Sequence, residues 1–249
     1  NFLEATLSKS ENSTPDNATK HPLKPQTTPP PAPGKPVGNR PNINIYMDFT
    51  NCVVKTVKGD KQFPGSTLET TFNGDSVRNF IRSQNPQAPQ TEIIFTPTIT
   101  YNKVPGQGWM GVKIPKGQAP MESSKNQLQL YMKAIKEVLS DRNSTFNALG
   151  KGSFAGQEVE KYYIAGYGKD VMDQVDGEIL VLSKGPNNGM MVSFNGKLTV
   201  GGEGDSYTIE ITDIGSAPKI QIPQNAKIMD PSSSTQLKPS QPISKPKNP

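Results

Sequence analysis

Histidine and cysteine are nearly absent from this chain, which has 249 residues and one of each. The histidine, His21, lies in a proline-rich stretch, so the rest of the chain has no imidazole for general-base chemistry or zinc binding. The lone Cys52 excludes an internal disulfide and any metal site built from cysteine pairs. Glycine-rich phosphate-binding loops are absent as well. The composition therefore predicts a protein that is not an enzyme, with no catalytic residue, metal site or cofactor.

Long hydrophobic runs are also missing, and no stretch is apolar for long enough to cross a bilayer. The hydrophobic fraction is 32%, and the shortage is concentrated at the two ends of the chain. Residues 1–41 hold nine of the 24 prolines and residues 230–249 hold five more. Such segments bury too little apolar surface to offset the entropy of ordering their backbone. We predict a proline-rich extended N-terminal arm (1–41), a folded domain (42–229) and a Pro/Ser/Lys-rich C-terminal tail (230–249). Deleting both end segments is expected to leave the stability of the domain nearly unchanged.

The net charge of +5 does not indicate a nucleic-acid-binding protein. Residues 42–229 contain 19 basic and 18 acidic residues, so the excess of lysine lies mostly in the two arms. The predicted domain also lacks a basic run interleaved with aromatic residues, which is the pattern that tracks a phosphate backbone. We therefore expect no nucleic acid partner.

Alternation of apolar and polar residues predicts a protein built mainly of strands. Ile43, Ile45, Met47 and Phe49 alternate with polar neighbours and predict a half-buried strand that continues to Val57. Asn-Gly pairs predict hairpins at 73–74, 188–189 and 195–196. One helix is expected after Ser124, the predicted N-cap, with apolar residues from Leu128 to Leu139 on one face. The predicted class is mainly β with helices (α+β).

Bulky and flexible apolar side chains on these elements have two interpretations. They form an ordinary core, or some of them line a cleft between a curved sheet and its covering helix, where methionines suit a hydrocarbon ligand. The candidates for the lining of such a cavity are Met47, Phe49, Phe72, Phe80, Trp109, Tyr131, Met132, Ile135, Met191 and Phe194. The sequence leaves both interpretations open.

Four local phrases resemble the LolA/LppX superfamily of bacterial extracytoplasmic lipoprotein domains, in particular the LppX/LprG type. They are Val104–Trp109, which leads to a tryptophan, Phe154–Tyr163 after the helix, the closing strand Tyr207–Gly215, and the exit Ile220–Pro223. The resemblance covers the predicted domain, residues 42–229. It implies a strongly curved antiparallel half-barrel sheet with a helical cover on its concave side. It also implies a carrier of lipids or lipid-linked molecules that has no covalent chemistry.

The resemblance suggests one function and the two arms suggest another. The first is a non-catalytic, membrane-associated domain outside the bacterial cytoplasm, periplasmic or on the cell surface, which binds a lipid or acyl chain in its cavity. Attachment to the membrane is then expected through an anchor that is not visible in this chain. The alternative is a structural or accessory subunit of a larger cell-envelope assembly, because long proline-rich arms depart from the pattern of the family. In that alternative, segments 1–41 and 230–249 contact protein partners.

Overall fold

The computed structural model describes residues 35–36, 40–59, 66–83, 90–169 and 172–230. Most of both predicted arms, with His21, lies outside these residues. The described elements are one helix, α1 (Pro120–Ser140), and thirteen strands: β1 (Lys35–Pro36), β2 (Asn51–Lys58), β3 (Thr67–Asn73), β4 (Ser76–Arg82), β5 (Thr91–Phe95), β6 (Ile99–Val104), β7 (Gly108–Lys113), β8 (Thr145–Phe154), β9 (Gln157–Tyr167), β10 (Gln174–Leu182), β11 (Met191–Val200), β12 (Glu203–Thr212) and β13 (Lys227–Met229).

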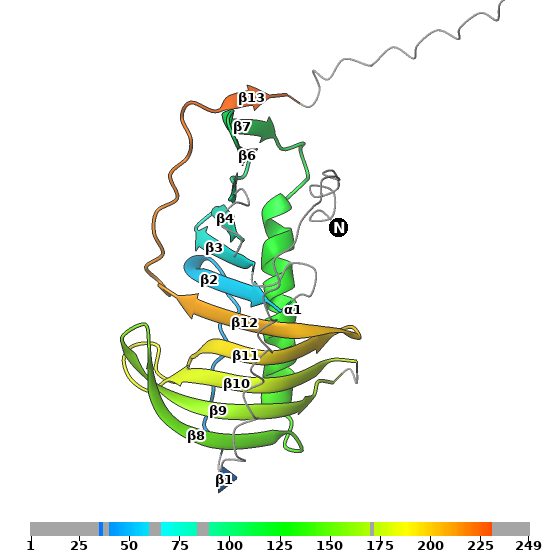
Figure 1. The fold of residues 1–249 in the computed structure, drawn as a ribbon, viewed down its shortest axis with the longest axis vertical. Helices are drawn as coiled ribbons and strands as arrows, with labels where there is room; N and C mark the ends of the chain where they lie inside the picture. The colour runs from blue at the N-terminus through cyan, green and yellow to red at the C-terminus, as the bar shows by residue number, and fades with distance from the viewer. Residues whose placement is uncertain (1–34, 37–39, 60–65, 84–89, 170–171, 231–249) are drawn as a thin grey trace, which may run out of the picture. The chain divides into compact units, whose positions relative to one another are not determined.

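All thirteen strands belong to one sheet in the order β1-β8-β9-β10-β11-β12-β2-β3-β4-β5-β6-β7-β13. Every neighbouring pair is antiparallel except β13 and β7, which are parallel. The first and last strands in this order are not paired with each other, so the sheet is curved but unclosed (Figure 1). The predicted class, a mainly β half-barrel with a helical cover, is therefore confirmed. The described residues contain a single helix.

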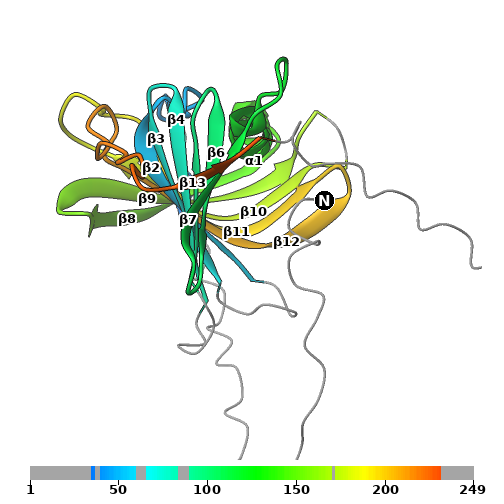
Figure 2. The same ribbon diagram turned by 90° about the horizontal axis from the view of Figure 1, so that it is seen from above.

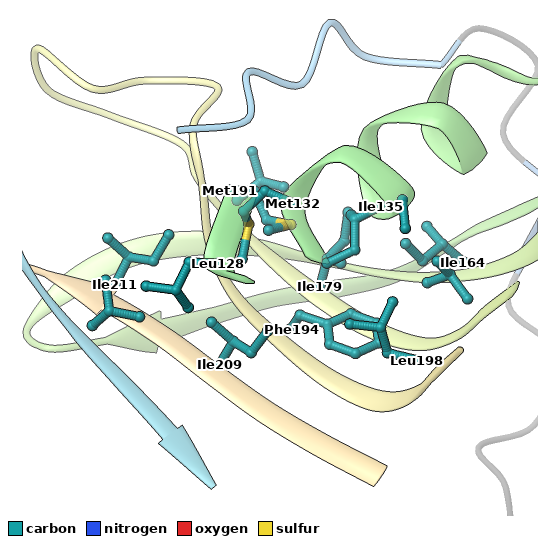
Figure 3. Close-up of a cluster of buried hydrophobic side chains, with 14 of the residues drawn as sticks. Leu128, Met132, Ile135, Ile164, Ile179, Met191, Phe194, Leu198, Ile209 and Ile211 are labelled. Carbon is teal, nitrogen blue, oxygen red and sulfur yellow. The ribbon is translucent and has the colours of Figure 1, made fainter. Parts of the chain in front are cut away.

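Helix α1 lies across the concave side of the sheet (Figures 1 and 2). Its buried residues recur at helical spacing and form one apolar stripe: Leu128, Met132, Ala134, Ile135 and Val138. Figure 3 shows side chains of this stripe pointing toward those of the strands, among them Ile164, Ile179, Met191, Phe194, Leu198 and Ile209. Because these groups interdigitate, the concave side of the sheet is a packed core.

The pair Gly177 and Gly196 explains why one predicted hairpin is wrong. Asn195 and Gly196 lie inside β11, and Gly196 is directly opposite Gly177 of β10. A Cβ atom added to Gly196 would be 2.4 Å from the Cα of Gly177 and 2.3 Å from the carbonyl oxygen of Asp176. Glycine is needed here because two backbones approach closely, not because the chain turns. The turn comes later, at Gly201 and Gly202, which both have positive φ.

The start of the helix was predicted one turn too late. Helix α1 begins at Pro120, whose fixed φ suits the first helical position, and no side chain caps its N-terminus. Ser124 is inside the helix, where its hydroxyl accepts a hydrogen bond from the Asn79 amide. Pro120 therefore marks the start of the helix, and Ser124, the predicted N-cap, does not.

Two further strand predictions are corrected by the structure. The sequence pattern after the helix predicts a strand only from Phe154, whereas β8 already begins at Thr145. The strand signal is weak there because Gly150 and Gly152 lie within β8, whose register shifts between Ala148 and Gly150. Residues 43–49 do not form a strand, and β2 begins at Asn51. Their burial does alternate, but apart from one isolated bridge between Asn44 and Met190 they pack on the core instead of pairing with a strand.

Contacts with the sheet extend to both predicted domain boundaries. Strand β1 pairs with β8, although it lies before Asn42, where the sequence predicts the start of the domain. The sheet therefore begins earlier in the chain than predicted. At the other end, β13 stops at Met229, and Asp230 forms an ion pair with Lys113. The segment between β12 and β13 contributes Ile220 to a second, outer cluster with Ile94 and Tyr101.

Candidate functional site

Most of the predicted cavity-lining residues are buried in the core. Six of the ten are no more than 2% exposed and belong to the main cluster: Phe49, Phe72, Met132, Ile135, Met191 and Phe194. Met47 and Tyr131 are partly buried against the same cluster. Eight candidates therefore come together as predicted, but as side chains that fill the concave side. Their role as the lining of a cavity stays a prediction.

The remaining two candidates lie in other surroundings. Trp109 packs on the outer cluster of Ile94, Tyr101 and Ile220, with the Lys103 ammonium 5.8 Å from its ring centroid. Phe80 lies between the guanidinium groups of Arg78 and Arg82, at 5.1 and 4.7 Å from its ring centroid. Because side chains alternate across a strand, these ring positions on β4 and β7 belong to the opposite face from the helix.

Residues 40–49, which we call the strap, run along one flank of α1, whose outward side stays exposed at Leu130. The strap runs antiparallel to the helix: Arg40 contacts the end of α1, Gln129 donates to the Met47 carbonyl oxygen at 3.1 Å, and Lys125 is 3.7 Å from Asp48. In the middle, the backbone of Asn44 pairs with Gly189 and Met191 at 2.8 and 2.9 Å. The strap thus connects the flank of α1 to the start of β11.

Arg40 attaches the beginning of the strap to the end of the helix. Its guanidinium donates to the carbonyl oxygens of Leu139 and Arg142 at 3.4 and 3.3 Å, and also to those of Asp141 and Ser144. The same group lies 5.5 Å from the centroid of the Phe146 ring. A cation at this position satisfies carbonyl groups that have no partner within the helix and complements the helix dipole.

A pocket of about 420 Å³ opens between the strap, the last turns of α1 and β8. It is lined by Arg40, Pro41, Asn42, Ile43, Asn44, Ile45, Lys136, Leu139, Ser140 and Phe146. None of the ten predicted residues lines this strap pocket. Its volume falls in the range of roughly 300–1,000 Å³ that is usual for sites of small molecules.

The lining of the strap pocket is divided between apolar and polar groups. Ile43, Ile45, Leu139 and Phe146 supply hydrocarbon surface, whereas Arg40 and Lys136 supply positive charge. None of the ten lining residues is acidic. The chemistry that matches such a lining is an amphiphile with an apolar chain and an anionic group.

A second, smaller pocket of about 180 Å³ lies beside the cluster of Val159, Leu182 and Val192. Ala155 and Asp213 both line it, and they are the non-glycine residues with positive φ in the described part of the chain. Both positions are turns at the ends of strands. Ala155 and Gly156 form the β8–β9 turn, with φ of 48° and 77°. The turns themselves therefore account for the positive φ of Ala155 and Asp213.

The titratable groups with clearly shifted pKa values are structural. Burial raises the pKa of the Cys52 thiol to about 12, with a smaller contribution from the charge of Asp48. Burial, followed by the hydrogen bond to Glu160, raises the pKa of Tyr162, which stacks on Phe146. Among the described residues, no group of three or more His, Cys, Asp or Glu side chains is arranged to hold a metal ion. The described part of the chain also has no helix long and apolar enough to cross a membrane.

Comparison with known proteins gives matches among solved structures. No protein-family model and no curated protein matches the sequence. The crystal structure of LprF from Mycobacterium bovis matches with a TM-score of 0.45 and 14% identity, over 72% of this chain and 91% of that one. The crystal structure of the Mycobacterium tuberculosis lipoprotein LppX matches with a TM-score of 0.39 and 11% identity, over 69% of this chain and 88% of that one. Both matches are LppX/LprG-type lipoproteins, the type that the sequence phrases resemble.

Proposed function

We propose that the protein is a non-catalytic, extracytoplasmic and membrane-associated domain that binds the acyl chain of an anionic amphiphile in the strap pocket. The observation that carries this proposal is the pocket of about 420 Å³ between the strap and the end of α1. Its apolar groups and its two cations, Arg40 and Lys136, line the same pocket. Burial of a hydrocarbon chain on this surface releases roughly 25 cal/mol per Å² of apolar area.

The position of the pocket also supports this function. The concave side of the sheet is filled by α1, so an apolar chain finds room beside the helix instead of beneath it. One wall of the pocket, residues 40–45, has few described hydrogen bonds to the sheet beyond those of Asn44. A wall of this kind adjusts to chains of different length more easily than a strand in the sheet does.

The experiment combines native mass spectrometry with binding of a fluorescent fatty acid. We expect protein purified from its source to carry lipid that organic extraction removes, and the extracted protein to bind the probe. Leu139→Trp fills the pocket and is expected to weaken probe binding by about tenfold or more. Leu130→Trp is the matched control, because Leu130 is on the same helix but 52% exposed and outside the pocket. Protein that is always lipid-free and binds no probe would overturn the proposal, as would equal losses in both variants.

A second candidate function, a structural subunit of a cell-envelope assembly, is favoured by the filled concave side. Met132, Ile135, Met191 and Phe194 are fully buried by contacts within the chain itself. In this function the half-barrel is a scaffold, and segments 1–41 and 230–249 contact the partners. Affinity purification of the full chain with and without those segments tests it. Loss of defined partner proteins on truncation supports the scaffold, and a lipid-loaded protein with no partner opposes it.

A further inference from the structure

Two segments that are distant in the sequence form a basic end of the sheet. Residues 93–121 and 214–229 contain five lysines and no acidic residue: Lys103, Lys113, Lys116, Lys219 and Lys227. Four acids border these segments, Glu92, Glu122, Asp213 and Asp230, and two of them, Glu92 and Asp230, pair with Lys103 and Lys113 at 3.3 and 2.8 Å. With all four acids included the net charge is +1, so the excess of positive charge belongs to the two segments themselves and not to the residues that border them.

The fold brings these two segments side by side at one edge. Strand β13 is parallel to β7 and is the last strand of the sheet, at the end remote from β8 (Figure 1). The chain that leads to β13 packs Ile220 on Ile94 and Tyr101 of β5 and β6. We call this region, made of β6, β7, residues 115–119 and residues 214–230, the basic edge.

The basic edge also exposes large apolar side chains. Ile222, Ile228 and Met229 are 40%, 42% and 40% exposed, and they are three of the six large hydrophobic residues exposed in the described part of the chain. The side chain of Ile228 lies over Gly111, where an added Cβ would be 2.4 Å from its Cδ1 atom. Trp109, with Lys103 over its ring, lies on the neighbouring strand. Aliphatic and tryptophan side chains among lysines are typical of surfaces that meet the interface of a membrane.

We propose that the basic edge docks on an anionic lipid surface. The lysines would interact with lipid phosphates, and Ile222, Ile228 and Met229 would enter the boundary between headgroups and acyl chains. A nucleic acid would use the same lysines but would leave these three aliphatic side chains in water, so the lipid surface fits the observations better. This docking is independent of the strap pocket, which is formed by other residues.

The test is cosedimentation of the full chain with phosphatidylcholine vesicles that contain or lack phosphatidylglycerol. We expect binding to the anionic vesicles only, and a decrease as NaCl is raised. The triple variant Lys116→Gln, Lys219→Gln, Lys227→Gln removes three lysines that have no acidic partner among the described residues. Its affinity for anionic vesicles should fall by roughly fivefold per lysine, or about a hundredfold in total. Ile228→Ser with Met229→Ser should also weaken binding, by about tenfold, with no change in charge.

The matched control is Lys151→Gln, Lys161→Gln, Lys197→Gln, which removes the same charge from β8, β9 and β11. Both arms are present in every variant, so differences between variants report on the described surface alone. The control should bind vesicles nearly as well as the unmodified chain. Equal losses in the two triple variants, undiminished binding by the serine variant, or no binding to anionic vesicles would each overturn the proposal. So would an affinity for single- or double-stranded DNA above that for vesicles, if the same lysine variant abolishes it.

Discussion

Replacing Arg40 is expected to loosen the strap and destabilise the domain. In Arg40→Met the aliphatic stem is largely kept, but the guanidinium is lost together with its bonds to the carbonyl oxygens at the end of α1. The Asp141 carbonyl keeps its bond from the Ser144 N–H at 3.2 Å, whereas carbonyl groups left without a partner must turn toward water or stay unsatisfied. Removal of the guanidinium also takes away the contact with the Phe146 ring.

The expected loss can be estimated from these contacts. A hydrogen bond to a charged group contributes about 1.5–3 kcal/mol when it is buried, and that figure is lowered here because Arg40 is only partly buried. A cation over an aromatic ring adds about 0.5–1 kcal/mol, and a cation at a helix C-terminus adds about 0.3–1 kcal/mol. Together these give a loss of about 2–3 kcal/mol in the free energy of unfolding. For a domain of this size, the melting temperature should fall by about 5–10 °C.

Thermal unfolding of Arg40→Met beside Arg142→Met measures this effect. Arg142 is exposed near the same end of the helix, and its side chain has no described contact, so its replacement should change the melting temperature by less than about 1 °C. Arg40→Lys keeps the charge but loses the forked geometry of the guanidinium, so its melting temperature should lie between those of Arg40→Met and Arg142→Met. A decrease below about 2 °C for Arg40→Met, or equal decreases for both methionine variants, would show that the guanidinium does not stabilise the fold.

Truncation separates the same contact from the rest of the N-terminal arm. The sequence predicts that removal of residues 1–41 leaves stability nearly unchanged, but the contacts of Arg40 predict a loss. Removal of residues 1–34 alone should leave the melting temperature within about 2 °C of that of the full chain. Removal of residues 1–41 should lower it at least as much as Arg40→Met does, because the pairing of β1 with β8 is lost as well.

Three further variants test the sheet and the core. Gly177→Ala should destabilise the domain by about 1–3 kcal/mol in urea unfolding, because its Cβ would be 2.7 Å from the Cα of Gly196; a stable variant would refute the close approach. Ala155→Asn should stabilise it by roughly 0.5–1 kcal/mol, since asparagine tolerates the positive φ that alanine adopts in the β8–β9 turn. The folded state raises the pKa of Cys52 from 9.0 to about 12, so the unfolded thiol ionises first and the free energy of unfolding falls as pH rises from about 9 to 12. The contribution of Cys52 to this decrease is at most about 1.4 kcal/mol per pH unit, and urea unfolding of Cys52→Ala at several pH values should lack it. If the free energy of unfolding falls with pH equally in the variant and the unmodified chain, the folded state does not raise the pKa of the thiol.

Local signals in the sequence predicted the parts of the fold that depend on neighbours in the chain. The Asn73-Gly74 pair marks the β3–β4 hairpin because Gly74, the first turn residue after Asn73, has the positive φ that glycine adopts readily. The apolar stripe of α1 predicted which face of the helix is buried, since helical spacing alone determines it. Both features are specified within one turn or a few residues.

The features that were missed depend on a partner far away in the sequence. Asn195-Gly196 has the appearance of a turn, and only the presence of Gly177 on the neighbouring strand shows that two backbones meet there. Alternating burial in residues 43–49 has the same period whether the partner is a strand or a helix, so the strap resembled a strand. The strap pocket joins Arg40 to Leu139 across 99 positions, which no local pattern indicates. The basic edge has a readable signal, the absence of acids in residues 93–121 and 214–229, but it becomes a surface only when β13 pairs with β7.

The packing of α1 limits where a ligand can enter. A hydrocarbon chain that took the place of the helix on the sheet would have to expose Leu128, Met132, Ile135 and Val138, which are at most 7% exposed. Returning one such side chain to water costs about 1.5–3 kcal/mol of free energy, so exposing all four costs on the order of 6–12 kcal/mol. That cost is comparable to the whole stability of a domain, about 5–15 kcal/mol, and displacement of the helix would therefore amount to unfolding. Movement of residues 40–45 exposes far less, because Ile43 and Ile45 are already partly open to solvent. The pocket that we propose for the ligand lies on the strap side of α1, and Arg40 and Lys136 are among its lining residues.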